Sequence, residues 1–271
     1  MKIQHLVITR FNVTISREGN IVPSLDWLQQ RMTIFEQYCL PSMMVQTCTN
    51  FIWLILMDES TPIEVRDCMT HYQQQVPMMR VLYVSQINDL TTFYHQLALE
   101  YTEEGNYVLT TRIDNDDVVC RTYIADIQYA AAQQEQIPVI LTFPHGCQLF
   151  LNDSVGLGLH WLSNHFVSLL ELRDEQTHTI LDYDHTTVGE HVPIYVENTS
   201  LPSWGEVVHS RNVSNDYTPH NHPSVERWNE LPFAGDWNSF LHYWRNVRYL
   251  MIFHTRYRVR SMCNLFKRLI R

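Results

Sequence analysis

Two kinds of segment alternate along the first half of the chain. Short apolar runs lie at Gln4 to Ile8, Phe51 to Met57, Arg80 to Val84, Tyr107 to Ile113 and Val139 to Phe143. The run from Phe51 to Met57 is apolar throughout, as is typical of strands buried on both faces of a parallel sheet. The segments between the runs favour helices. This alternation predicts an α/β fold, with a mostly parallel, Rossmann-like sheet flanked by helices.

Polar residues with capping chemistry mark where these helices begin. Ser24 precedes a predicted helix through about Tyr38, in which Trp27, Arg31 and Phe35 recur at helical spacing. Three further helices are predicted, from a capping box at Thr61-Pro62-Ile63-Glu64, from Asp89 to near Gly105, and from about Arg121 to Gln136.

The second half of the chain is less regular. Short strands are expected at Cys147 to Leu151, His191 to Val196 and Glu206 to His209, and the aromatic segment Asp236 to Phe253 is amphipathic. We place a soft boundary near residue 145, so that residues 1–145, 146–235 and 236–271 form three parts. We expect one continuous sheet across residue 145 rather than two separate domains, and a helical C-terminal tail.

Charge is distributed unevenly along the 271 residues. The formal net charge is −10, which argues against a nucleic-acid-binding protein, because phosphate neutralisation needs a basic surface. No acidic residue follows Asp236, whereas the last 30 residues contain Arg245, Arg248, Arg256, Arg258, Arg260, Lys267, Arg268 and Arg271. This basic tail is compatible with peripheral contact with an anionic membrane and equally with a packed terminal helix whose arginines offset the acidic body.

Several familiar classes of protein lose support from missing motifs. The six cysteines form no C-x-x-C pair and have no zinc-ligand spacing, so we expect them to be reduced in a cytoplasmic protein. His5 and Arg10 interrupt the apolar N-terminal run, and we expect no secretory signal. No P-loop, G-x-G-x-x-G or G-x-S-x-G occurs, which disfavours kinases, dehydrogenases and α/β-hydrolases.

Chemically capable residues follow three of the predicted strands. Arg10 follows the first, Asp58 the second, and Asp114 to Asp117 the fourth, directly after Arg112. Because ligands of open α/β sheets bind beyond the carboxyl ends of the strands, these side chains are expected on one edge.

The acidic cluster contains the pair Asp114 and Asp116 in a D-x-D arrangement. Mg²⁺ and Mn²⁺ prefer oxygen ligands, and one or two carboxylates together with substrate phosphates suffice to hold Mg²⁺. One carboxylate would bind the ion and the other a nucleotide ribose, while Arg112 would add charge against the phosphates. The alternative is a solvated acidic turn that begins a helix, where aspartate is common.

Two histidine positions stand out among the 14 in the chain. His209 follows the short apolar segment Trp204 to Val208. His220 and His222 are two residues apart and so are candidate metal ligands, but they lie in a Pro/Asn-rich loop where exposed histidines are common.

Together these segments resemble a known family. The acidic cluster, Ile8 to Asn12, Arg31 to Ser42, Trp53 to Pro62 and Trp204 to Asn215 are similar to the bacterial rhamnosyltransferases. The resemblance implies a GT-A-type glycosyltransferase fold, with residues 1–145 as the nucleotide-sugar-binding half and residues 146–235 as the acceptor-binding half. It implies Mn²⁺ or Mg²⁺ as cofactor and a nucleotide-diphosphate sugar, dTDP-rhamnose or a UDP-sugar, as donor. It implies a glycan or lipid-linked glycan as acceptor, in the synthesis of surface polysaccharide.

The resemblance also assigns roles to residues. Asp114, Asp116 and His209 would hold the metal, Asp58 would contact the base, and Arg10, Arg112 and Asp114 would face the rest of the nucleotide. An inverting enzyme also needs a carboxylate base, for which Glu171 is the first candidate and Asp153 the second. The alternatives are a GT-A-like module that binds nucleotide or carbohydrate without turnover, and a metal-dependent phosphohydrolase or nucleotidyltransferase.

Overall fold

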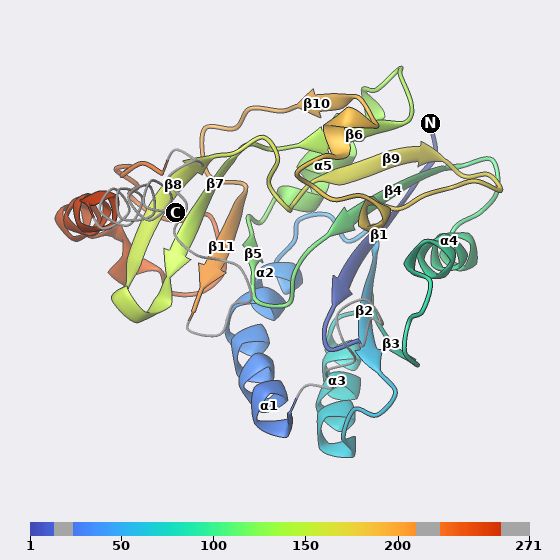
Figure 1. The fold of residues 1–271 in the computed structure, drawn as a ribbon, viewed down its shortest axis with the longest axis horizontal. Coiled ribbons are helices and arrows are strands. Elements are labelled where there is room, and N and C mark those ends of the chain that lie inside the picture. Colours follow the sequence, from blue (N-terminus) through green and yellow to red (C-terminus); the bar gives the residue numbers. More distant parts are fainter. Residues whose placement is uncertain (14–23, 210–222, 256–271) are drawn as a thin grey trace, which may run out of the picture.

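The computed structural model describes residues 1–13, 24–209 and 223–255, arranged around two sheets (Figure 1). Its strands are β1 Ile3–Arg10, β2 Ile52–Asp58, β3 Met79–Val84, β4 Tyr107–Arg112, β5 Val118–Val119, β6 Val139–Thr142, β7 His145–Phe150, β8 Val155–His160, β9 Ser168–Leu172, β10 Ile194–Val196 and β11 Trp204–Val208. Its α-helices are α1 Leu25–Ile34, α2 Leu40–Met44, α3 Ile63–Gln75, α4 Leu90–Tyr101 and α5 Tyr123–Ala132, and residues 243–255 are also helical. Shorter turns of helix lie at η2 Phe35–Cys39, η3 Leu151–Asp153, η4 Ile180–Asp182, η5 Val188–Glu190 and η7 Asn238–Leu241.

The larger sheet has seven strands in the order β10-β6-β9-β4-β1-β2-β3. The pairs β4-β1, β1-β2 and β2-β3 are parallel, and only β9 runs antiparallel to its neighbours β4 and β6. The predicted mostly parallel α/β sheet is therefore confirmed. All five strands predicted in the first half of the chain belong to it.

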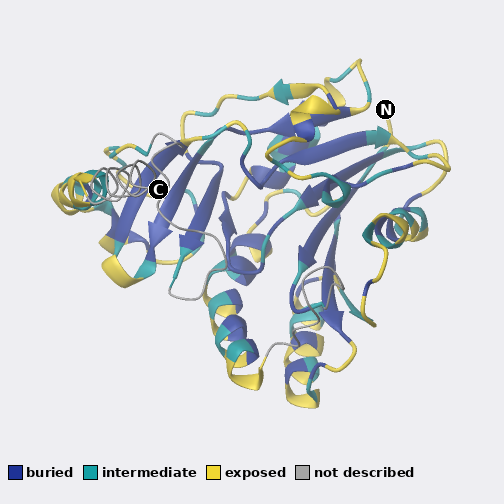
Figure 2. Ribbon diagram, in the orientation of Figure 1, coloured by how far each residue is buried: buried dark blue, intermediate teal, exposed yellow. Residues whose placement is uncertain are grey.

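Residues that alternate along β1 and β2 face two different layers of helices. Val7 and Trp53 pack in a core with residues of α1, α3 and α5, whereas Ile8 and Leu54 pack against Tyr94 and Leu97 of α4. Because successive strand residues point to opposite faces, both faces must be apolar where helices cover both. Figure 2 shows the strands buried and the outer sides of the helices exposed.

A second sheet lies beside the first, in the order β5-β11-β7-β8. Strands β9 and β10, which follow residue 145, do join the larger sheet, but β7, β8 and β11 do not. The expectation of one continuous sheet is therefore wrong for these three strands. One physical reason lies in the short strand β5, which pairs with β11 immediately after the acidic turn and so gives the second sheet its own edge.

Three of the predicted helices were assigned a capping side chain, and two of these caps are present. The Ser24 side chain accepts a hydrogen bond from the Trp27 amide at 3.2 Å, and Asp89 accepts one from the Thr92 amide at 3.2 Å. The predicted capping box at Thr61 is wrong. Its hydroxyl instead donates to the Asp58 carbonyl oxygen at 2.6 Å, and α3 begins after Pro62 without a side-chain cap.

The first helical segment is longer than predicted, because the π-helical turn η2 joins α1 to α2 and the helical backbone continues to Met44. Within the described ranges, the five cysteines are free thiols, and no helix is both long and apolar enough to cross a membrane.

Candidate active site

The carboxyl ends of three parallel strands bring the predicted residues to one edge of the larger sheet. Arg10 ends β1, Asp58 ends β2, and Arg112 ends β4. The register pairs Ile8 with Arg112 and Arg10 with Leu56. As predicted, these side chains belong to neighbouring strand ends, so the acidic turn 114–117 leaves the sheet beside them.

The first carboxylate of this turn is paired with the arginine just before it. Arg112 donates to both oxygens of Asp114, from Nε at 2.9 Å and from NH2 at 2.6 Å. Burial alone would raise the pKa of Asp114, but the Arg112 guanidinium overrides this and lowers it well below the usual range. Asp114 is therefore ionised at neutral pH. The two hydrogen bonds orient the Arg112 guanidinium, whose other terminal nitrogen can donate to an anion.

The third residue of the turn, Asp116, is held by a residue from a distant part of the chain. Arg31 of α1 forms a buried ion pair with Asp116 and also donates to the Asn115 side-chain oxygen at 3.2 Å. His209 Nε2 lies 3.1 Å from the same Asp116 carboxylate. The Asn115 amide donates in turn to the Phe11 carbonyl oxygen at 3.1 Å. Asp116 and His209 are thus brought together as predicted, but Asp116 is also paired with Arg31 of α1.

The fourth residue, Asp117, is completely buried and faces the second sheet. One of its oxygens accepts from the Val207 amide of β11 at 2.9 Å, and the other lies 2.8 Å from His165 Nε2. Burial, reinforced by the Asp116 charge, raises the pKa of Asp117 to about 7, although the hydrogen bond with His165 opposes the shift. The same hydrogen bond outweighs burial at the imidazole and raises the pKa of His165. A proton bound at this pair lies between the Asp117 carboxylate and the His165 imidazole.

One set of side chains has the geometry of a metal centre. Single ligand atoms of Asp114, Asp117 and His165 all lie within 4.8 Å of one another. Two carboxylates and an imidazole suit Mn²⁺, and with phosphate oxygens added they also suit Mg²⁺. A cation would also compensate the charge that burial makes costly at Asp117. These three residues therefore fit a divalent cation, in a grouping that shares only Asp114 with the predicted set Asp114, Asp116 and His209.

A further carboxylate lies near this cluster. Glu206 of β11 is 5% exposed, and its side chain accepts from Gln148 of β7 at 2.6 Å. Burial raises the pKa of Glu206, an effect that His165 counteracts. Glu206 adds a fourth acidic group, after the three aspartates of the turn, to the surroundings of His165.

Asp58 is buried and already makes local hydrogen bonds. Its Oδ1 accepts from the Ser60 amide at 2.8 Å and from the Ser60 hydroxyl at 2.5 Å. The Asn12 side chain accepts from the Asp58 amide at 3.2 Å and donates to Thr61 at 3.1 Å. This network fixes the turn after β2 and so the direction of the Asp58 carboxylate.

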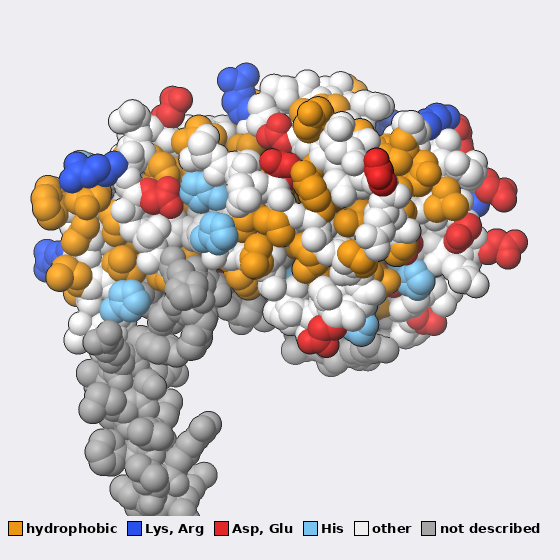
Figure 3. Space-filling model, turned by 90° about the horizontal axis from the view of Figure 1, so that it is seen from above, with side chains coloured by type: hydrophobic (Ala, Val, Ile, Leu, Met, Phe, Trp, Pro, Cys, Tyr) orange, Lys and Arg blue, Asp and Glu red, His pale blue; other side chains and the backbone are white. Residues whose placement is uncertain are grey.

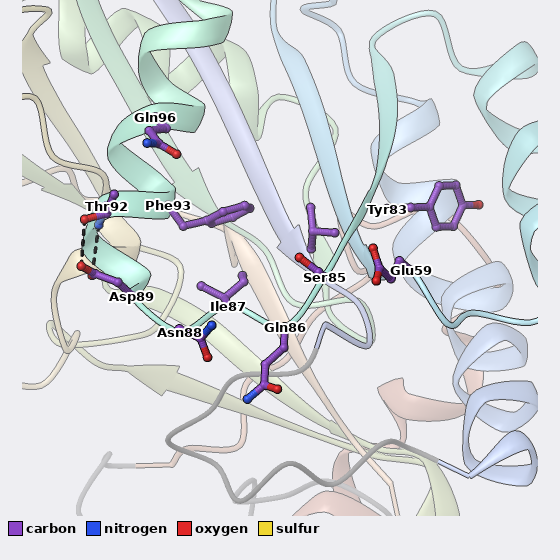
Figure 4. A pocket seen from close by; sticks show the side chains of 11 residues that line it. Glu59, Tyr83, Ser85, Gln86, Ile87, Asn88, Asp89, Thr92, Phe93 and Gln96 are labelled. Carbon is purple, nitrogen blue, oxygen red and sulfur yellow. Dashed lines mark hydrogen bonds between the residues drawn. The ribbon is translucent and has the colours of Figure 1, made fainter.

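A cavity of about 430 Å³ lies beyond the ends of β2 and β3 (Figure 4). Glu59 and Tyr83 line one side of it, Phe93 and Gln96 of α4 line the other, and the segment from Ser85 to Asp89 lies between them. Neighbouring strands are about 4.8 Å apart. The ends of β2 and β3 are therefore displaced by roughly 10–14 Å across the sheet from the end of β4, where Asp114 follows.

The two predicted catalytic bases lie in different parts of the fold, and Glu171 is far along its strand from this cluster. Glu171 is on β9, opposite Val108 near the beginning of β4, and accepts from the His178 amide at 2.6 Å. The antiparallel register therefore places it toward the opposite edge from Arg112. Asp153 is exposed in the turn between β7 and β8, which follows Phe150, the partner of Val208 at the end of β11. His220 and His222 lie outside the described residues.

Three residues in or near the site escaped sequence reasoning: Arg31, His165 and Glu206. The position of Arg31 within an aromatic helical stripe was a usable signal, since a cation on a buried face needs a partner. His165 and Glu206 had no such signal, because only the meeting of the two sheets brings them near the turn.

Comparison with known proteins now identifies the class. The family described as "Putative rhamnosyl transferase" matches residues 10–221. The chain belongs to this family and is thereby placed among the glycosyltransferases.

Solved structures of S. aureus TarS are also similar to the chain. For residues 1–349 of TarS the identity is 11% over 76% of this chain and 60% of that one, with a TM-score of 0.42. For the same TarS fragment in complex with UDP the identity is 13% over 77% and 61%, with a TM-score of 0.44. The chain thus spans about 60% of the length of these structures. No curated protein matches it.

Proposed function

We propose that this chain transfers a sugar, rhamnose by the family description, from a nucleotide-diphosphate donor to a glycan acceptor. The observation that supports this most directly is the grouping of Asp114, Asp117 and His165 beside Arg112, on the sheet edge that also bears the cavity. Family membership supplies the reaction class. The donor would be dTDP-rhamnose or a UDP-sugar, and the acceptor a glycan or lipid-linked glycan for surface polysaccharide.

The geometry suggests how such a donor would lie. Its nucleoside would occupy the cavity beyond β2 and β3, next to Asp58, and its diphosphate would extend across the sheet edge toward Asp114. Arg10 and Arg112 end the two central strands on this path. An arginine fork suits phosphate oxygens, and both guanidinium groups would counter the charge of the leaving diphosphate.

Mn²⁺ or Mg²⁺ would be held by Asp114, Asp117 and His165, with Asp116 and His209 adjacent. When bound, the cation would act as a Lewis acid toward the diphosphate. The protein's own task is to keep Asp114 ionised through Arg112 and to release the proton shared by Asp117 and His165. We propose that the Glu206 carboxylate adds negative charge next to His165. Glu171 and Asp153 stay the predicted candidates for the catalytic base.

The deciding experiment measures sugar transfer to an acceptor with each candidate donor, with Mn²⁺ or Mg²⁺ and after chelation. Transfer should require the cation, and Asp117→Asn should reduce it by at least about 100-fold, the scale of losing one preorganised electrostatic group. Asp67→Asn, at an exposed position on α3, serves as the matched control and should retain activity.

Binding separates the alternatives. Thermal denaturation with dTDP, UDP, GDP and ADP, each with Mn²⁺, should show one nucleotide raising the melting temperature, because ligand binding stabilises the native state. Binding without transfer would indicate a non-catalytic module, and hydrolysis of the donor without transfer a phosphohydrolase. If no nucleotide shifts the melting temperature and no donor reacts, the proposal fails.

A further inference from the structure

The helix of residues 243–255 has two apolar faces, and only one of them packs against the described part of the protein. Tyr249 and Leu250 contact the apolar cluster of Phe150, Val155 and Leu157 on the second sheet. The rings of Tyr249 and Phe150 are 5.0 Å apart. On the same face, the buried Asn246 donates to the Phe240 carbonyl oxygen at 2.9 Å. This face, with its spacing of three and four residues, attaches the helix to the protein.

The opposite face carries large apolar side chains into solvent. Trp244 is 77% exposed, Met251 66% and Ile252 39%. These residues, together with exposed Arg248 and Thr255, follow the spacing of one helical stripe. Scattered apolar residues on a surface need no explanation, but a tryptophan and two aliphatic side chains on a single stripe indicate a contact surface.

The charged side chains that the helix itself carries beside and within this stripe are basic. Arg248 lies in the stripe and Arg245 beside it, and no acidic residue occurs after Asp236 in the sequence. The rest of the chain is strongly acidic, since the net charge is −10 overall. Figure 3 shows Lys/Arg and hydrophobic side chains next to one another at the left end of the molecule, where Figure 1 places this helix.

We propose that this stripe, formed by Trp244, Arg248, Met251 and Ile252, binds the surface of an anionic phospholipid bilayer. An interfacial helix needs an apolar face that enters the acyl boundary and cations that face the headgroups. Tryptophan is favoured at that depth because its ring is amphipathic. A protein partner would have to be acidic and apolar at once. The proposal rests on the proposed function for its purpose, since it would hold the active site near a lipid-linked acceptor.

Co-sedimentation of the full chain with vesicles tests this directly and needs no donor or turnover. The chain should bind vesicles of phosphatidylcholine mixed with phosphatidylglycerol, and not vesicles of phosphatidylcholine alone. Trp244→Ser with Met251→Ser should weaken binding by at least about tenfold, given the apolar area lost. Arg248→Glu should weaken it by about 25-fold, since one surface cation contributes roughly fivefold and reversal counts twice.

Ile63→Ser provides the matched control, because Ile63 is an exposed aliphatic residue, 63% exposed, at the start of α3. Equal binding by all variants, or no binding by the parent chain, would overturn the proposal. A dimer in sedimentation that Trp244→Ser abolishes, without vesicle binding, would assign the stripe to a second copy instead. Transfer to a soluble acceptor should not change in these variants, so failure of the membrane proposal is distinguishable from failure of the proposed function.

Discussion

Replacing Arg31 by methionine tests whether the buried ion pair with Asp116 organises the acidic turn. The two side chains are each 8% exposed, so water screens their attraction little. Methionine keeps much of the volume of the arginine stem and removes the charge. Arg31→Met therefore leaves the Asp116 carboxylate buried within a turn that also contains Asp114 and Asp117.

The cost follows from the electrostatics of a partly polar interior. Two unit charges about 4 Å apart attract by about 4 kcal/mol at an effective dielectric constant near 20. Removing one partner of a buried pair typically costs about 3–5 kcal/mol. We therefore expect Arg31→Met to lower the free energy of unfolding by about 3–4 kcal/mol. Asp116→Asn in the Arg31→Met background should restore about 2–3 kcal/mol of this, and the single variant Asp116→Asn completes the cycle that gives the coupling energy between the two sites.

Urea unfolding followed by circular dichroism at neutral pH measures all of these values. Lys2→Met is the matched control, because Lys2 pairs with Glu103 on the surface, where both side chains are about two-thirds exposed. Such a pair contributes at most about 1 kcal/mol. If Arg31→Met costs no more than Lys2→Met, or if the double variant is additive, then Asp116 is not held by Arg31 as an ion pair.

Two further predictions concern the core. Burial lowers the pKa of His5 to about 3, below the ordinary 6.5, so the unfolded state binds a proton first. The contribution of His5 to stability should be constant above pH 6.5 and fall by about 1.4 kcal/mol per pH unit below it, and His5→Gln should remove this contribution while exposed His71→Gln should not. At Gly146 an added Cβ would lie 2.2 Å from the Trp204 ring, whereas at Gly156 the nearest atom is at 3.4 Å. Gly146→Ala should therefore lower the urea midpoint by the equivalent of about 3 kcal/mol, and Gly156→Ala by much less. Equal midpoints for the two alanine variants would contradict this packing.

The larger sheet was predictable because its strands are encoded locally. The run Ile52–Asp58 is apolar on both faces, since helices cover both, and that pattern survives without knowledge of its neighbours. In the second sheet, strands near β7 and β11 were predicted, from Cys147 to Leu151 and Glu206 to His209, but their separation from the larger sheet was not. Strand β7 contains His145 and Gln148, and β11 contains Glu206, so neither reads as a buried run. Their polar side chains are satisfied by contacts with Glu226 and with each other, which only the folded chain provides.

The residues of the candidate site fall into the same two groups, those that local patterns predict and those that only long-range packing brings together. Arg10, Asp58 and Asp114 follow strands, and the rule that parallel strands end on one edge was enough to bring them together. His165 and Arg31 reach the turn from a loop and a helix, across 48 and 85 positions of the sequence. Contacts of that range depend on how the second sheet and α1 pack, and no local pattern of residues encodes them.

The four residues of the turn differ in how their charge is compensated, and this difference bears on where a cation would bind. Asp114 has the Arg112 guanidinium on both oxygens, and Asp116 has Arg31. Among the described residues, the side chain of Asp117 is bonded to one amide and one imidazole, and its raised pKa reflects burial without a full countercharge. Binding of a divalent cation is most favourable where a buried carboxylate has no arginine or lysine partner, because the cation then displaces a proton rather than an arginine. The electrostatics thus favour Asp117 and His165 over Asp116 and His209 as the ligands that join Asp114.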